Sequence, residues 1–241
     1  MTGRNRSGIK DMPLPIPKTD HWRYERKFAI SLSKHEVESF VKLHPALFAE
    51  IYRERRINNI YFDTPSLSNY YDSIWGRSRR MKVRIRWYAD YSASCEIVQN
   101  PVLEIKTKNG LLGGKALYPL DSFPMDGISD KKVLYKTFRD SDIPAQVKEC
   151  MMGLNPRLVN SYSRKYFLSI DREFRITIDS DLYYGDPFEA GNSFHDLTTT
   201  VLELKYREEA DFFVDSITSY FPFRIAKCSK YVTGIGILGY E

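Results

Sequence analysis

Residues 81–90, MKVRIRWYAD, alternate between apolar and cationic side chains. Successive side chains of a β-strand point to opposite faces of its sheet, and this period of two distinguishes a strand from a helix. The segment is therefore predicted to be a strand with Val83 and Ile85 on one face and Lys82, Arg84 and Arg86 on the other. Three aligned cations face either bulk water or an enclosed space that holds an anion, and the rest of the chain decides between these alternatives.

The same alternation recurs in other segments that have the pattern of strands. Charged side chains two residues apart occur at Glu25 and Lys27, at Glu104, Lys106 and Lys108, and at Glu203 and Lys205. Arg175, Thr177 and Asp179 also share one face, and Arg164 begins a similar set. An ordinary half-buried sheet also alternates in this way. Here, however, the polar faces carry mostly Lys and Arg rather than Ser, Thr or Asn. In addition, a carboxylate precedes a lysine by two residues in ERK (25–27), EIK (104–106) and ELK (203–205), which indicates one shared site.

Strand patterns outnumber helix patterns along the chain. Hairpins are predicted around NGLLGG (109–114) and DRE (171–173), because these segments supply turn residues between alternating runs. Ser33 and Glu36 form a capping box for a helix that is expected to reach about His44. Two short helices are expected within 127–152. The predicted fold class is α+β, mainly β: a single antiparallel β-barrel with flanking helices over residues 21–241.

Composition and charge set looser limits. The 241 residues carry a formal net charge of +5, and 42% of them are hydrophobic, which is enough for a core. Three widely spaced cysteines (Cys95, Cys150 and Cys228) form no disulfide framework and no CxxC metal motif, so reduced thiols are expected. Residues 1–20 lack the apolar region of a signal peptide and are predicted to be a poorly ordered leader. No apolar run reaches the length of a membrane helix, and a cytoplasmic location is expected.

The residue types on the charged faces fit a chain of phosphates. Arg binds phosphate oxygens through paired hydrogen bonds and Lys acts as a compact point charge. Carboxylates among these cations repel phosphate unless they hold a divalent metal, and Mg²⁺ or Mn²⁺ takes one or two carboxylates together with phosphate oxygens. Cations with a few glutamates are therefore the set of groups expected for metal-assisted phosphoryl transfer.

The order of these motifs resembles the VTC (vacuolar transporter chaperone) polyphosphate polymerase domain, a member of the triphosphate tunnel metalloenzyme and CYTH-like superfamily. The resemblance covers residues 22–236 and rests on YERKF, NNIYFDTP, KVRIRWY, LEIKTKNG, SRKYF, RITID, VLELKY and KCSKYVTGI, in that order. It implies an eight-stranded antiparallel tunnel whose basic interior binds triphosphate or polyphosphate. It also implies ATP as the phosphoryl donor and a divalent metal, Mn²⁺ or Mg²⁺, held by glutamates.

The resemblance and the strand faces together give a set of candidate site residues. The catalytic candidates are Arg84, Arg86, Lys106, Arg164 and Arg175. The phosphate-binding candidates are Lys27, Lys82, Lys115, Lys205, Lys227 and Lys230. The metal-binding candidates are Glu203, Glu25 and Glu104. The family often keeps only part of the E-x-E-x-K triad of the first strand, and the segment ERK lacks its first half.

Other functions remain open at this point. A triphosphatase would use the same tunnel with water as the acceptor, and a polyanion-binding module would keep the basic tunnel without turnover. A nucleic-acid reader is not expected, because the cations lie on inward strand faces. The segment GIGILG (234–239) lacks the βαβ context of a dinucleotide motif. Four aromatic residues (Tyr61, Phe62, Trp87 and Tyr88) could stack on bases, but barrel packing is the expectation for them.

Overall fold

The computed structural model describes residues 23–89, 96–110 and 112–240. The predicted leader, residues 1–20, and Cys95 lie outside the described residues. The main sheet is antiparallel, and its strands follow one another in the order β1 (Arg23–Ile30), β11 (Thr200–Arg207), β9 (Arg175–Gly185), β8 (Asn155–Leu168), β2 (Ala49–Asp63), β3 (Arg79–Ala89), β5 (Val102–Asn109) and β6 (Leu112–Pro119). Strand β10 (Ser193–Asp196) pairs with β9, and β4 (Ile97–Val98) pairs with β7 (Phe123–Pro124) in a separate sheet. A mainly β, α+β fold with flanking helices is confirmed.

The closed eight-stranded barrel is not found. Within the described ranges, no ladder joins β1 to β6, so the main sheet has two free ends. Part of the edge of β1 is occupied instead by a segment that precedes the last helix. The Ala226 amide donates to the Lys27 carbonyl at 2.8 Å, and Phe28 forms an isolated bridge with Ile225. This pairing between distant parts of the chain uses hydrogen-bonding groups that a closing strand would need.

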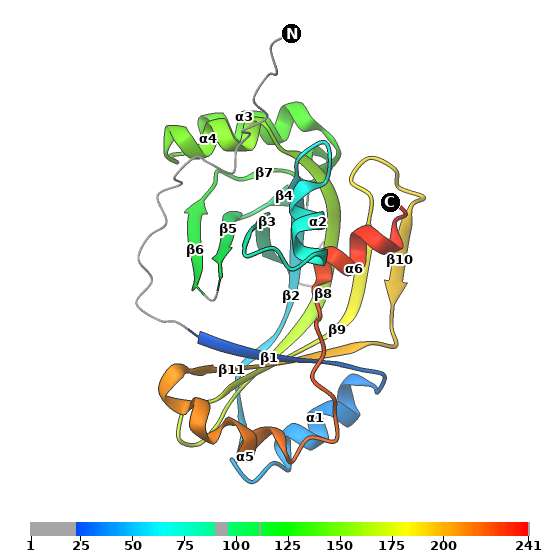
Figure 1. The fold of residues 1–241 in the computed structure, drawn as a ribbon. Coiled ribbons are helices and arrows are strands. Elements are labelled where there is room, and N and C mark those ends of the chain that lie inside the picture. The colour runs from blue at the N-terminus through cyan, green and yellow to red at the C-terminus, as the bar shows by residue number, and fades with distance from the viewer. Residues whose placement is uncertain (1–22, 90–95, 111, 241) are drawn as a thin grey trace.

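The open sheet is nevertheless strongly curled. Strands β1 and β5 are six steps apart in the sheet order, which in a flat sheet would separate them by about 29 Å. Yet Lys106 on β5 is close enough to Glu25 on β1 and Lys205 on β11 for their charges to shift its pKa. The sheet therefore brings its distant strands face to face, and in Figure 1 strands β1 and β11 cross beneath the ends of the others.

Helices cover the convex side of the curled sheet in two places. Helices α3 (Lys131–Asp140) and α4 (Ala145–Met152) cover a core of β2, β3 and β5 side chains that includes Val83, Ile85 and Leu103. Helices α1 (Lys34–Lys42) and α5 (Val214–Thr218), with the 3-10 turns η3 (Glu208–Phe213), cover a second core that includes Phe28, Ile178 and Leu204 (Figure 1). A further 3-10 turn, η2 (Met125–Ser129), precedes α3. Because both cores take the apolar faces, the charged faces point to the concave side. The predicted capping box of α1 is confirmed, with Ser33 and Glu36 bonding reciprocally.

A third core fills part of the concave side. Helices α2 (Ser68–Ile74) and α6 (Lys230–Ile237) pack there against tyrosines of β2, β8 and β9. Tyr61 stacks on Tyr231 with 5.1 Å between ring centroids. A Cβ atom at Gly234 would lie 2.6 Å from Leu158 and 2.8 Å from Tyr184, so the helix approaches the sheet closely only because this residue is glycine. The first glycine of GIGILG, Gly234, therefore serves helix packing.

Cys150 and Cys228 are free thiols, as predicted. No helix in the described parts of the chain has the length and apolar character needed to cross a membrane.

Candidate phosphate-binding site

The alternation in β3 places Lys82, Arg84 and Arg86 on the concave face, while Val83 and Ile85 enter the core. Strand register extends this row of cations sideways. Lys82 lies directly opposite Lys106 on β5, and Lys106 lies opposite Lys115 on β6. Like charges in directly opposed positions destabilise a sheet. Three lysines in register are therefore a costly arrangement that a bound anion would relieve.

A single carboxylate lies among these cations. Glu104 is 1% exposed and forms ion pairs with Arg84 at 2.9 Å, Lys106 at 3.3 Å, Lys115 at 3.4 Å and Arg86 at 3.5 Å. Burial acts to raise the pKa of Glu104, but the charge of Arg84, followed by those of the other three cations, holds that pKa well below its usual range. We refer to Glu104, these four cations and Lys82, which lies opposite Lys106 in register, as the Glu104 side. Its cations far exceed its negative charge.

The pKa values of two lysines on the Glu104 side are lowered. The pKa of Lys106 is lowered to about 8, first by burial and then by the charge of Arg84. Half of the Lys106 side chain, 51%, is nevertheless accessible to water. A side chain that is accessible yet poorly hydrated lies in a concavity with protein around it. The pKa of Lys82 is also lowered to about 8, by burial and then by Lys27, and its ammonium donates to the Ser229 hydroxyl at 2.8 Å.

The facing strands β1 and β11 carry a different arrangement. The Lys27 ammonium lies 2.6 Å from Glu25 and 3.2 Å from Glu203, and Lys205 lies 2.9 Å from Glu203. Burial and the charge of Glu203 act to raise the pKa of Glu25, but Lys27 and Lys205 outweigh them and lower it. For Lys27, burial acts to lower the pKa, but the charges of Glu203 and Glu25 raise it overall. Carboxylates and ammonium groups alternate here and stabilise each other's charged forms.

A buried triad continues this side of the site. Asp179, fully buried on β9, pairs with Arg164 of β8 through both carboxylate oxygens at 2.5 and 2.6 Å, and with Lys230 of α6 at 2.5 Å. Arg164 also reaches Glu203 at 3.7 Å. The Tyr162 ring lies 4.6 Å from the Lys230 ammonium. We call the residues Glu25, Lys27, Glu203 and Lys205, together with this triad, the Glu203 side.

Most of the predicted side chains thus lie together on the concave face. Arg175 lies at its edge, half-buried and opposite Lys205 in register. Lys227 is exposed, and among the described residues it has no ion-pair partner. Asp179, a central residue of the site, is not among the site residues predicted from the sequence. Asp179 follows Thr177 by two residues on the face of Arg175, so strand periodicity predicts that its side chain points inward. Only the fold shows that Arg164 and Lys230 are its partners.

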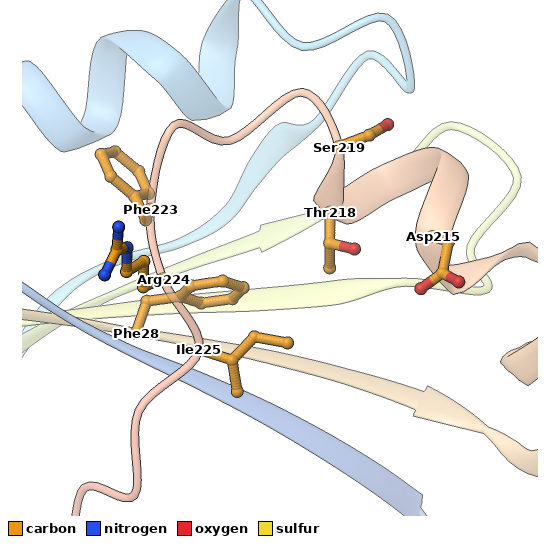
Figure 2. Close-up of a pocket in the computed structure, with 7 residues that line it drawn as sticks. All are labelled: Phe28, Asp215, Thr218, Ser219, Phe223, Arg224 and Ile225. Carbon is orange, nitrogen blue, oxygen red and sulfur yellow. The ribbon is translucent and has the colours of Figure 1, made fainter.

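The structure also contains a hollow that lies away from this site. It has a volume of about 450 Å³ and lies on the convex side, between β1, α5 and residues 223–225 (Figure 2). Phe28, Phe223 and Ile225 contribute apolar lining, whereas Asp215 and Arg224 are its charged residues. Asp215 already accepts from Arg26 at 2.8 Å. One cation and one occupied carboxylate do not provide the positive charge that a phosphate chain needs.

One comparison with known protein families confirms the family resemblance. The model of the VTC domain family matches residues 22–238. No curated protein sequence matches the chain. Solved structures with some similarity include a candidate adenylate cyclase from Vibrio parahaemolyticus, with 12% identity, coverage of 88% of this chain and 98% of the other, and a TM-score of 0.49. A candidate adenylyl cyclase from Hippeastrum, described as having a dominant triphosphatase activity, has 14% identity, 88% and 96% coverage and a TM-score of 0.47. The PH1819 protein from Pyrococcus horikoshii has 10% identity, 87% and 96% coverage and a TM-score of 0.46.

Proposed function

Because the chain belongs to the VTC domain family, we propose that its concave face binds ATP and inorganic polyphosphate and transfers the γ-phosphoryl group from the one to the other. The excess of cations over carboxylates on the Glu104 side is the observation that supports this proposal. Four cations paired with one carboxylate, together with Lys82 beside them, bind a polyanion and stabilise charge that spreads over the transferred phosphoryl group.

The proposed reaction needs positioning rather than a protein nucleophile. A terminal oxygen of the polyphosphate forms a bond to the γ-phosphorus of ATP, the bond from that phosphorus to the β–γ bridging oxygen breaks, and ADP leaves. Arg84 and Arg86 bind the equatorial phosphate oxygens, because guanidinium groups pair well with them. Lys82, Lys106 and Lys115 hold the neighbouring phosphates in line. The facing lysines, Lys27 and Lys205, approach the chain from β1 and β11.

The Glu203 side offers oxygen ligands for a divalent metal. Glu203 and Glu25 lie close together, and the Thr177 hydroxyl, which is directly opposite Glu203 in register, is buried without a hydrogen bond among the described residues. Magnesium takes one or two carboxylates and completes its shell with water and phosphate oxygens, so these residues fit. No group of three or more His, Cys, Asp or Glu residues in the described chain is arranged to hold a metal, so substrate oxygens would have to complete the shell. When bound, Mg²⁺ or Mn²⁺ neutralises charge on the phosphates.

Glu104 fits a metal less well than the other two predicted glutamates. Four cations between 2.9 and 3.5 Å already surround its carboxylate. A divalent cation would have to enter the most positive part of the site. We therefore propose that Glu104 holds Arg84 and Arg86 in position, and that Glu203 and Glu25 bind the metal.

³¹P NMR of the purified protein with ATP and Mn²⁺ tests this function. Growth of internal polyphosphate resonances together with ADP is expected. Arg86→Gln should lower the rate by roughly 10²–10³-fold, as for removal of other preorganised charge-stabilising donors. Glu203→Gln should weaken Mn²⁺ binding, which electron paramagnetic resonance measures directly. Orthophosphate without internal resonances would show a triphosphatase instead, and an unchanged ATP spectrum with tight polyphosphate binding would show a binding module.

A further inference from the structure

Tyr88 differs from the other aromatic residues near the charged strands. Tyr61, Phe62 and Trp87 are 6%, 1% and 3% exposed, and packing explains them as expected. Tyr88 is 47% exposed. An exposed tyrosine at the end of a strand of phosphate-binding candidates is not explained by the core.

The position of Tyr88 continues the row of cations on β3. Residues two apart on a strand share a face, so Tyr88 follows Arg84 and Arg86 along the concave side. The Arg86 guanidinium lies 5.6 Å from the centroid of the Tyr88 ring. A group attached to the end of a phosphate chain bound at Arg84 and Arg86 would therefore extend toward this ring.

Arg55 on the neighbouring strand β2 completes the cluster. It is exposed and lies opposite Arg164 in register, which places it on the charged face. Its guanidinium lies 5.6 Å from the Tyr88 ring and 5.1 Å from the Tyr52 ring. Among the described residues, no carboxylate forms an ion pair with Arg55. Tyr52 is 49% exposed and meets Tyr166 edge to face at 5.6 Å.

Exposed aromatic rings and guanidinium planes next to phosphate-binding cations are the surfaces on which proteins stack nucleobases. We propose that Tyr88, supported by Arg55, is a nucleobase subsite at the edge of the concave face. The subsite holds the base of the nucleotide while Arg84 and Arg86 hold its phosphates. This inference rests on the proposed function, and it adds that the site distinguishes a nucleoside triphosphate from inorganic triphosphate. Because every base has a π-face, stacking favours ATP and GTP about equally.

Calorimetric titration of two ligands tests the subsite. One ligand is β,γ-imido-ATP, which is not cleaved, and the other is inorganic triphosphate, both with Mg²⁺. Tyr88→Leu should weaken binding of the ATP analogue by between about five-fold and about a hundred-fold, the range for loss of one base–aromatic stack. Binding of triphosphate should change by less than about two-fold, because the phosphates do not need the ring. Tyr88→Phe keeps the ring and should bind both ligands like the wild type.

Tyr24→Leu is the matched control. Tyr24 is also an exposed strand tyrosine, at 44%, but it stacks on Tyr206, which belongs to the core on the convex side. This variant should leave both affinities unchanged. Three results would overturn the subsite. Tyr88→Leu could weaken binding of both ligands equally, or it could change the affinity for neither. Alternatively, Tyr88→Phe could lose as much affinity for the ATP analogue as Tyr88→Leu. If the wild type bound neither ligand, the proposed function would be overturned together with the subsite. If it bound triphosphate, and Tyr88→Leu did not weaken binding of the ATP analogue selectively, only the subsite would be overturned.

Discussion

The two sides of the concave face use the same residue types for opposite purposes. On the Glu104 side, four cations share one carboxylate, and Lys82 lies in register beside Lys106 without a carboxylate of its own among the described residues. On the Glu203 side, three carboxylates (Glu25, Asp179 and Glu203) are interleaved with Lys27, Lys205, Arg164 and Lys230. The first arrangement is incomplete without an anion, and the second is nearly neutral. This difference is the basis of our proposal that the Glu104 side binds phosphates and that Glu203 and Glu25 on the facing side hold a metal.

The lysines of the two sides show this difference most directly. The pKa values of Lys82 and Lys106 are lowered to about 8, whereas those of Lys27 and Lys230 are raised. Burial acts to lower all four values. Neighbouring carboxylates reverse its effect only for Lys27 and Lys230, so Lys82 and Lys106 lose their charge at a lower pH than Lys27 and Lys230 do.

The largest expected effect on stability comes from the buried triad. Asp179→Asn should lower the free energy of unfolding by about 3–5 kcal/mol, because it leaves Arg164 and Lys230 buried without their carboxylate. Urea unfolding followed by circular dichroism measures the loss. Asp215→Asn is the control, since it breaks an ion pair with Arg26 in which the Asp215 side chain is 87% exposed, and such pairs contribute about 0–1 kcal/mol. Equal losses in the two variants would contradict a structural role for the triad.

Glu104→Gln should separate stability from affinity. Stability should fall by roughly 3 kcal/mol, near the lower limit for breaking a buried ion pair, because Lys106 and Lys115 keep access to water. The affinity for triphosphate should rise several-fold, because one negative charge in the phosphate site is removed. Calorimetric titration, with and without Mg²⁺, measures this change. Weaker binding that depends on the metal would show that Glu104 is a metal ligand, as the sequence alone suggested.

The three E-x-K motifs show both the reach and the limit of sequence reasoning. Strand periodicity correctly placed each glutamate and lysine on one face, because side-chain direction in a strand depends only on local geometry. It could not show that Glu25 and Glu203 lie side by side while Glu104 is surrounded by cations. That difference depends on strand order, which pairs β1 with β11 and β5 with β3 and β6.

Long-range pairing also explains what the sequence missed in the fold. Barrel closure was expected, but the edge of β1 pairs partly with residues 225 and 226, about 200 positions away in the chain. The role of Asp179 likewise depends on Lys230 from the last helix. No local pattern encodes such contacts. The correct predictions were therefore those that a single strand or turn determines, such as the capping box of α1.

The pH dependence of triphosphate binding should depend on the Glu104 side. Between pH 7 and 9, Lys82 and Lys106 lose charge because their pKa values are about 8. The loss of charge on each lysine should weaken triphosphate binding by up to about ten-fold per pH unit above the pKa of that lysine. Stability should change in the opposite direction. In the unfolded chain, Lys82 and Lys106 have a pKa of about 10.4. Between about pH 8 and 10 they therefore hold more protons in the unfolded chain than in the folded protein, and folding becomes more favourable as the pH rises.

A double variant, Lys82→Arg with Lys106→Arg, isolates this effect. Arginine keeps its charge throughout the range, so binding of triphosphate should vary less between pH 7 and 9 than in the wild type. Calorimetric titration at both pH values, with the ligand's own protonation common to both proteins, provides the comparison. An unchanged pH dependence in the variant would mean that other groups control the affinity.

The smallest expected effect concerns Lys227, the predicted phosphate ligand that lies outside the cluster. It is exposed, whereas Lys230, three residues later, is buried against Asp179. Lys227→Gln should weaken triphosphate binding by less than about three-fold at 0.15 M salt, because solvent and salt screen an exposed charge. Its effect should grow at low ionic strength, where screening is weaker. Calorimetric titration at two salt concentrations measures the loss of affinity at 0.15 M salt and its increase at low ionic strength. A large loss at high salt would place Lys227 in direct contact with phosphate, and residues 225–229 would then have to fold inward when the ligand binds.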